Sequence, residues 1–207
     1  MALVMSLLAA CSGGGDASPA TTATTPTVTA TTEADPTTTV APTTTEAPTT
    51  TIDPAEALAA AVEADLLAGI DAITTALQDP TNDEKVGQAR DHQAGSNLAF
   101  FERRLSEFLE RGYQLRPNPT VPAEVMIEVA ASLVEGSADF AELRVCEVDS
   151  WVTVEPGAGP NGSDAIVDPD VLVYRSVYFM RDAGDRWKIE GSRELGSWEG
   201  VDACPPA

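Results

Sequence analysis

Two carboxylates in the second half of the chain stand two positions apart, in a segment rich in β-branched residues. Glu147 and Asp149 flank Val148, and side chains two apart on a strand point to the same face of a sheet. If that face lines a hollow, burial raises the pKa of a carboxyl group and suits it to act as a general base. If the face meets water, as is usual for acidic strand residues, both are solvated surface groups.

The phase of this strand changes along its length. Leu143 and Val145 share the parity of the two acids, whereas Val152 and Val154 do not. One regular strand cannot bury both sets on a single face, because its side chains alternate between faces. A β-bulge near Ser150 would reconcile the two halves.

The other reactive residue types give weaker signals. His92 is the single histidine, and no nucleophile-elbow motif accompanies it, so we expect a structural or neutral role. A zinc site is not expected, because its ligands would have to be carboxylates and paired sulfurs. The sequence contains neither an EF-hand loop nor a phosphate-cradling glycine motif. We therefore expect no metal and no cofactor.

Aromatic residues in the strand-rich half could line a ligand pocket or fill the core. These residues are Trp151, Tyr174, Tyr178, Trp187 and Trp198. Aromatic side chains at strand spacing are compatible with either role. Both interpretations stay open at the level of sequence.

Helical patterns come first in the folded part of the chain. Asp53-Pro54 is a helix start, with a capping side chain followed by proline at the first helical position, and apolar residues recur at helical spacing up to residue 77. A second capping signal at Thr81 predicts a short helix to about residue 93. Ser96 opens a third helix, and Gly112 is expected to terminate it. The proline-rich segment 115–122 predicts irregular structure.

Strand patterns follow. We expect strands over residues 124–133, 140–154, 171–181 and 186–195, with a long loop over 155–170 and a hairpin turn over 182–185. Val173 and Val177 alternate with Tyr174, Ser176 and Tyr178, so the aromatic and hydroxyl side chains share one face. Helices followed by a mostly antiparallel sheet predict an α+β fold.

The N-terminus carries an export signature. Residues 2–10 form an apolar run too short to span a bilayer, and it ends in Leu8-Ala9-Ala10-Cys11, which resembles the lipobox of bacterial lipoproteins. The resemblance implies a signal peptide over residues 1–10, a lipid on the Cys11 sulfur and cleavage before Cys11. No basic residue precedes the apolar run, which departs from such signals and suggests an upstream start codon. The alternative is a chance apolar N-terminus with a stray cysteine.

A linker is expected between the lipid and the folded domain. Residues 12–51 hold seventeen threonines and no Leu, Ile, Phe, Trp, Tyr or Met. Such a composition cannot bury enough apolar surface to offset its ordering entropy. We therefore divide the chain into a signal peptide (1–10), a lipid-anchored disordered Thr/Pro linker (11–52) and one folded domain (53–207).

The charge balance excludes one class of partner. The chain has a net charge of -21, and no Lys or Arg precedes Lys85. Nucleic-acid binding needs a basic surface that releases phosphate counterions, so nucleic acid is not an expected partner. Contact with the membrane is expected through the lipid anchor only.

The cysteine count suggests a disulfide. With Cys11 carrying lipid, Cys146 and Cys204 remain, and an even remainder in an exported chain favours a bridge. The alternative is a reactive thiol, which needs a neighbour that lowers its pKa. The acidic neighbours Glu147 and Asp202 would raise it.

The element order and the final hairpin resemble the NTF2-like, or SnoaL-like, superfamily. Asp185-Arg186-Trp187-Lys188-Ile189 matches the acidic, basic, Trp, basic, aliphatic pattern common in its last strand. The resemblance implies a cone in which N-terminal helices pack on a curved antiparallel sheet. It does not fix a function, because the superfamily holds enzymes and non-enzymatic modules alike.

We expect an acidic lipoprotein of the cell envelope, on the extracytoplasmic face of the membrane. Its domain is interpreted as a non-catalytic binding module for a partner protein or a small apolar ligand. The alternative is an isomerase-like enzyme that uses Glu147 or Asp149 as its base. An open cavity holding these acids favours the ligand or enzyme interpretation, whereas a filled cone favours a protein partner.

Mass spectrometry of the native protein tests the export signature. We expect Cys11 to be the N-terminal residue and to carry diacylglycerol and acyl mass, because the lipobox directs both modification and cleavage. An unmodified N-terminus at Met1 in the native protein would contradict this prediction.

Overall fold

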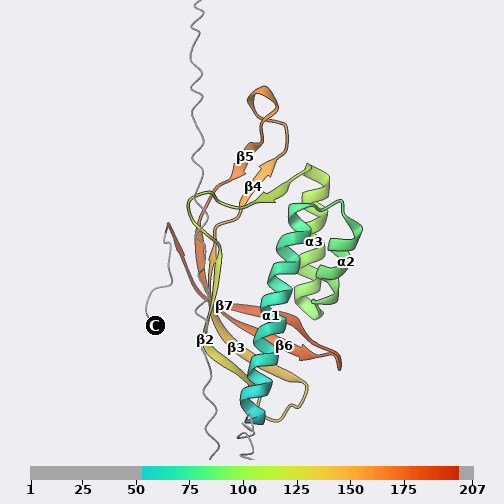
Figure 1. Ribbon diagram of the computed structural model, residues 1–207, viewed down its shortest axis with the longest axis vertical. Helices are drawn as coiled ribbons and strands as arrows, with labels where there is room; N and C mark the ends of the chain where they lie inside the picture. The colour runs from blue at the N-terminus through green and yellow to red at the C-terminus, as the bar shows by residue number, and fades with distance from the viewer. Residues whose placement is uncertain (1–52, 201–207) are drawn as a thin grey trace, which may run out of the picture. The chain divides into compact units, whose positions relative to one another are not determined.

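The computed structural model describes residues 53–200. Three helices, α1 (Pro54–Gln78), α2 (Asp83–Asp91) and α3 (Gly95–Arg111), precede every strand. They lie together on one side of a curved antiparallel sheet (Figure 1). The predicted α+β class, with N-terminal helices packed on a curved sheet, is confirmed. Within the described residues no helix combines the length and apolarity needed to cross a membrane.

The helix ends follow from local hydrogen bonding. Asp53 caps α1, since its carboxylate accepts the N–H of Ala55 at 2.8 Å and Pro54 occupies the first turn. Asn82, not Thr81 as the sequence suggested, caps α2 by accepting the N–H of Lys85 at 3.2 Å. Gly112 ends α3 with a positive φ of 69°, a conformation that favours glycine.

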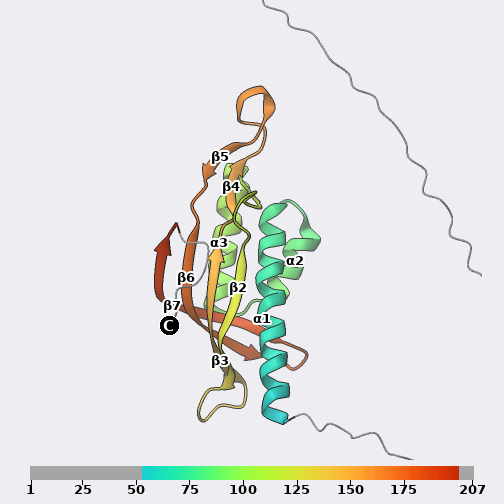
Figure 2. The same cartoon turned by 60° about the vertical axis from the view of Figure 1, so that its left-hand side comes forward.

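Within residues 53–200, seven strands form two sheets. The larger sheet has the order β2-β3-β6-β7 and is antiparallel throughout. The smaller sheet, β1-β4-β5, continues beyond it and includes a hairpin that projects past the helices (Figure 2). The strand bounds are β1 Gln114–Arg116, β2 Glu124–Leu133, β3 Phe140–Asp149, β4 Val152–Glu155, β5 Ala165–Asp168, β6 Leu172–Asp182 and β7 Trp187–Glu199.

The single strand expected over 140–154 is two strands. β3 ends at Asp149, the chain turns through the buried Ser150, and β4 begins at Val152 in the other sheet. The carboxylate of Asp149 accepts the N–H of Trp151 at 3.2 Å and so stabilises this turn. The parity change in the sequence therefore marks a switch between sheets, not the bulge that we expected.

Two proline-containing segments are more regular than expected. Residues 115–122 begin inside β1, because Leu115 and Arg116 pair with Thr153 and Val152. The segment 155–170 contains a short 3-10 helix, Pro160–Gly162, and the strand β5. The two strands in these segments, β1 and β5, belong to the smaller sheet. Its strands are too short to show a clear hydrophobic period in the sequence.

The core lies between α1 and the larger sheet. Val62 and Leu66 of α1 are fully buried against Leu143 and Val145 of β3 and Ile189 of β7. A second cluster joins the helices to one another and to β1. The last hairpin behaves as predicted, since Trp187 and Ile189 are buried while the intervening residue is not.

Cys146 lies on the face of β3 that points away from the helices. It is fully buried with Val148 and Val173 in a small cluster on that face. Cys204 lies outside the described residues, so its pairing with Cys146 stays a prediction.

Thiol titration tests this bridge. The unfolded, unreduced native protein is expected to show no free sulfhydryl, and the Cys204→Ser variant is expected to show one. The bridge would close a loop of about 58 residues and stabilise the fold by about 4 kcal/mol in the chain-entropy account. Two free thiols in the native protein would overturn the pairing.

Candidate functional site

A cavity of about 570 Å³ separates the helices from the inner face of the larger sheet. Its helical wall is mainly apolar, and its sheet wall carries most of the polar groups. The apolar side chains are Ile70, Ile73, Leu77, Phe100, Phe101, Leu115, Trp151, Leu172 and Ile189. The polar side chains of the strands are Glu147, Asp149, Thr153, Asp168, Tyr174, Ser176, Tyr178, Ser192 and Glu194.

Strand alternation produces the polar wall. On β3 the residues of odd number face the helices, so Glu147 and Asp149 follow Val145 on the same side. On β6 the inward side chains include Tyr174, which pairs with Glu147, and Tyr178. The sequence predicted that the aromatic and hydroxyl side chains of β6 share one face, and this prediction is confirmed.

Glu147 and Tyr178 form the central polar contact of the cavity. The phenol O–H of Tyr178 donates to the carboxylate of Glu147 at 3.0 Å. Both residues lie deep in the fold, yet their side chains are only half-buried because they face the cavity. Burial raises the pKa of the Glu147 carboxyl, the nearby charge of Asp149 raises it further, and the Tyr178 hydrogen bond opposes this rise.

The same environment keeps Tyr178 protonated. Burial raises the pKa of its phenol well above the ordinary value, and the charges of Glu147 and Asp149 add to the effect. Tyr178 is therefore a fixed hydrogen-bond donor at neutral pH. Glu147, whose carboxyl pKa is raised, is a group that can gain or lose a proton inside the cavity.

Asp149 lies nearer to the end of the sheet. Burial raises the pKa of its carboxyl, while the N–H of Trp151 and the positive charge of Arg104 lower it. The negative charge of Asp168 on β5 also raises the pKa of the Asp149 carboxyl. Asp149 thus has a cationic neighbour, whereas the pKa of Glu147 is set by burial, by the phenol of Tyr178 and by the negative charge of Asp149.

Both sequence candidates line the cavity instead of facing water on the opposite side of the sheet. A catalytic role for Glu147 and Asp149 stays a prediction. Cys11 lies outside the described residues, as Cys204 does. Within the described residues no group of three or more His, Cys, Asp or Glu side chains is arranged to hold a metal ion.

His92 lies apart from the cavity. Its ring Nε2 is 3.4 Å from the guanidinium of Arg186, and burial, with the positive charge of Arg186, lowers its pKa. Its backbone carbonyl accepts the N–H of Ile189 at 2.9 Å and joins the end of α2 to β7. This arrangement is consistent with a structural role.

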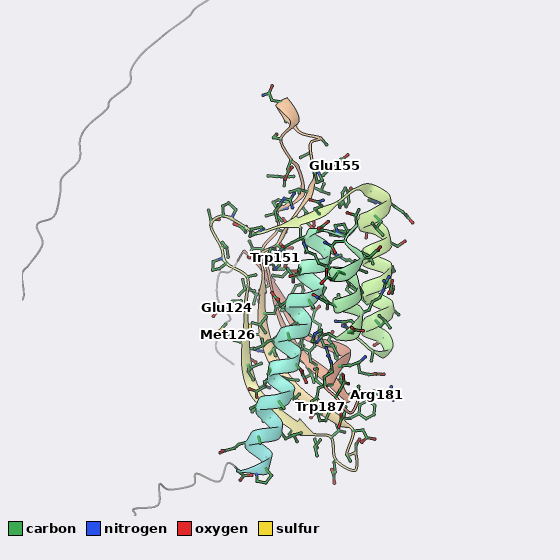
Figure 3. All side chains as sticks on the ribbon, turned by 45° about the vertical axis from the view of Figure 1, so that its right-hand side comes forward. Glu124, Met126, Trp151, Glu155, Arg181 and Trp187 are labelled. Atoms are coloured by element: carbon green, nitrogen blue, oxygen red, sulfur yellow. The ribbon has the colours of Figure 1, made fainter. Side chains whose placement is uncertain are left out.

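The five aromatic candidates divide between three locations. Trp151, Tyr174 and Tyr178 line the cavity, whereas Trp187 belongs to the core. Figure 3 shows Trp151 nearer than Trp187 to the hairpin that carries Glu155. Trp198 is exposed on the other face of the sheet, where the guanidinium of Arg175 lies 5.6 Å from its ring centroid.

Ser192 and Glu194 of the polar wall were missed by the sequence interpretation. Both lie an even number of residues after Lys188. Simple alternation along the strand therefore places them with Lys188, on the face opposite to Trp187 and Ile189. A register shift between Phe179 and Met180 inserts one extra residue in β7, so Tyr178 pairs with Ser192 and Ser176 pairs with Glu194. The bulge turns both side chains toward the cavity.

Comparisons with known proteins add little to this geometry. No protein-family model matches the sequence, and the search of curated proteins gives no significant match. Among solved structures, the intermembrane space region of the chloroplast protein ARC6 is similar with a TM-score of 0.47 and 14% identity, covering 70% of this chain and 98% of that chain.

A second similar structure is a ketosteroid isomerase-like protein from Erwinia carotovora atroseptica. It has a TM-score of 0.38 and 13% identity, covering 66% of this chain and 95% of that chain. Both likenesses concern the fold, so the functional argument rests on the cavity itself.

Proposed function

We propose that the domain binds a small amphipathic molecule in the cavity between its helices and its larger sheet. The observation that carries this proposal is the division of one 570 Å³ cavity into an apolar helical wall and a polar sheet wall. Ligand pockets in proteins usually have volumes of roughly 300–1,000 Å³, mostly apolar linings and a few convergent polar groups. The cavity has a volume in this range and convergent polar groups, and its apolar side chains are concentrated on the helical wall.

The two walls assign the two ends of the ligand. An apolar body would pack against Ile70, Ile73 and Phe100 of the helices. A polar group would reach Tyr178, which can donate to it, and Glu147, which can accept from it. Burying this polar group without a partner would cost free energy, so the contact also selects for ligands that carry one.

The cavity favours a small ligand over a partner protein as the principal occupant. A binding module for proteins needs no internal hollow and usually presents a large apolar surface patch. Here polar groups from several strands converge on one cavity. We further propose that the Cys11 lipid and the Thr/Pro linker hold this domain on the extracytoplasmic side of the membrane.

Acid–base catalysis on the bound molecule is a second candidate. It is favoured by the raised pKa of the Glu147 and Asp149 carboxyl groups, because a base titrating nearer to neutral pH exchanges protons more effectively. Under this candidate, Asp149→Asn or Glu147→Gln abolishes turnover while a ligand still binds. If the domain only binds its ligand, neither the parent chain nor either variant shows turnover.

Cavity binding is tested with the full chain carrying Cys11→Ser, so that no acyl chain competes for the probe. We expect the neutral fluorophore anthracenemethanol to bind saturably. Ser192→Trp should weaken that binding by about tenfold or more, which corresponds to about 1.4 kcal/mol, because the new ring occupies cavity volume. The measurement is fluorescence titration, with thermal unfolding to verify that the variant is folded.

Arg193→Trp is the matched control. Arg193 neighbours Ser192 on β7 but borders a shallow hollow on the opposite face of the sheet. Its substitution should leave the dissociation constant unchanged. Equal loss of affinity in both variants, or no saturable binding by the parent chain, would refute the cavity as the ligand site.

A further inference from the structure

The cavity is acidic in a way that apolar ligand binding alone does not require. Five carboxylate side chains border it, and Arg104 is the one basic side chain among the residues that line it. The five acids are Glu147, Asp149, Asp168, Asp170 and Glu194. They come from β3, β5, the segment after β5 and β7, so several elements place like charges around one hollow.

Arg104 does not neutralise this group. Its side chain is exposed, and its guanidinium lies 5.3 Å from the ring centroid of Phe108. Within the part of the chain that the structure describes, none of the five acids is in a salt bridge with Arg104 or with any other basic residue. Arg104 acts on Asp149 only through its longer-range charge.

Glu147 is the acid whose environment points most directly to a ligand. It lies half-buried at the centre of the polar wall, and its hydrogen-bond partner among the described residues is a neutral phenol. Buried carboxylates in proteins are normally paired with a cation or take up a proton. A ligand that carries a positive charge would supply the missing partner.

We propose that the ligand of this cavity is a protonated amine with an apolar body. Its ammonium group would lie against Glu147 and Asp149, and its apolar body would contact the helical wall. This inference rests on the proposed ligand-binding function and names the chemical class that the site accepts.

The aromatic lining supports the same class. Phe100, Trp151 and Tyr174 border the cavity together with the acids. A cation near the face of an aromatic ring gains about 0.5–2 kcal/mol, with the larger values for desolvated sites. Carboxylates and phosphates would meet repulsion from the acids and no favourable contact with these rings, so anionic ligands are excluded by the same groups.

The inference makes binding depend on pH with a defined sign. An ammonium group binds best when the carboxyl groups are ionised, and burial raises their pKa in the empty cavity. Affinity for the amine therefore increases as the pH rises through these values, and binding releases protons. The titratable and charged groups that face Glu147 across the cavity are Asp149, Tyr174, Tyr178, Arg104, Asp168, Asp170 and Glu194.

Three probes of the same size test the inference: aminomethylanthracene, anthracenemethanol and anthracene carboxylate. In the Cys11→Ser chain we expect the amine to bind about tenfold more tightly than the alcohol, as a charge-assisted hydrogen bond would give. The carboxylate should bind more weakly than both. Affinity for the amine should rise as the pH increases through the raised pKa values of the Glu147 and Asp149 carboxyl groups, while affinity for the alcohol should not rise.

Glu147→Gln and Asp149→Asn remove charge with little change in shape. Each should reduce the preference for the amine over the alcohol and leave binding of the alcohol within about twofold. Glu142→Gln is the matched control, because Glu142 is an exposed residue of β3 that faces away from the cavity. It should leave the preference unchanged.

The outcomes separate this inference from the function on which it rests. If the alcohol binds in the cavity and the amine binds no more tightly at any pH, the amine class is wrong and ligand binding stands. If none of the probes binds, or Ser192→Trp affects none of them, the ligand-binding function fails as well. The pH series uses the parent chain, so it does not depend on the folding of any variant.

Discussion

The carboxyl group of Glu147 is held inside the domain with a phenol, not a cation, as its hydrogen-bond partner. This placement is costly, because a desolvated carboxylate loses its hydration and regains only part of it from Tyr178. A carboxyl whose pKa is higher in the folded chain than in the unfolded chain makes the fold less stable as the pH rises between the two values. The acid therefore opposes folding at neutral pH, which agrees with the proposal that it serves a bound molecule.

The architecture around this group keeps the cavity open. β3 delivers Glu147 and Asp149 to the inner face and then stops, since the chain turns at Ser150 into a second sheet. The bulge in β7 adds Ser192 and Glu194 to the same face. The core lies around the middle of α1, the first half of β3 and the end of β6. Hydrophobic packing is thus concentrated beside the cavity, and polar side chains occupy the remainder of the inner face.

Periodic patterns made the larger elements predictable. The capping residues and apolar spacing of α1 and α3 located these helices closely, and strict alternation identified β6 together with its inward hydroxyl and phenol groups. The side of the sheet on which Glu147 lies was ambiguous, because the parity change after Asp149 could mean a bulge or a new strand. Pairing between distant segments decides that choice, as it decides the side on which Ser192 and Glu194 lie. A single sequence carries no direct record of such pairing.

The most direct measurement is the pKa of the Glu147 carboxyl in the empty cavity. It can be measured by carbon-13 NMR of the glutamate-labelled chain across a pH titration. The Glu147→Gln variant identifies the Glu147 signal, because that signal is missing from its spectrum. A buried carboxyl that faces a neutral phenol should titrate clearly above the ordinary glutamate value of about 4.3. Saturation with aminomethylanthracene should bring that pKa down, because the ammonium group stabilises the ionised form. An ordinary pKa that does not respond to the amine would contradict the account, since it would mean that Glu147 is solvated and takes no part in a ligand site.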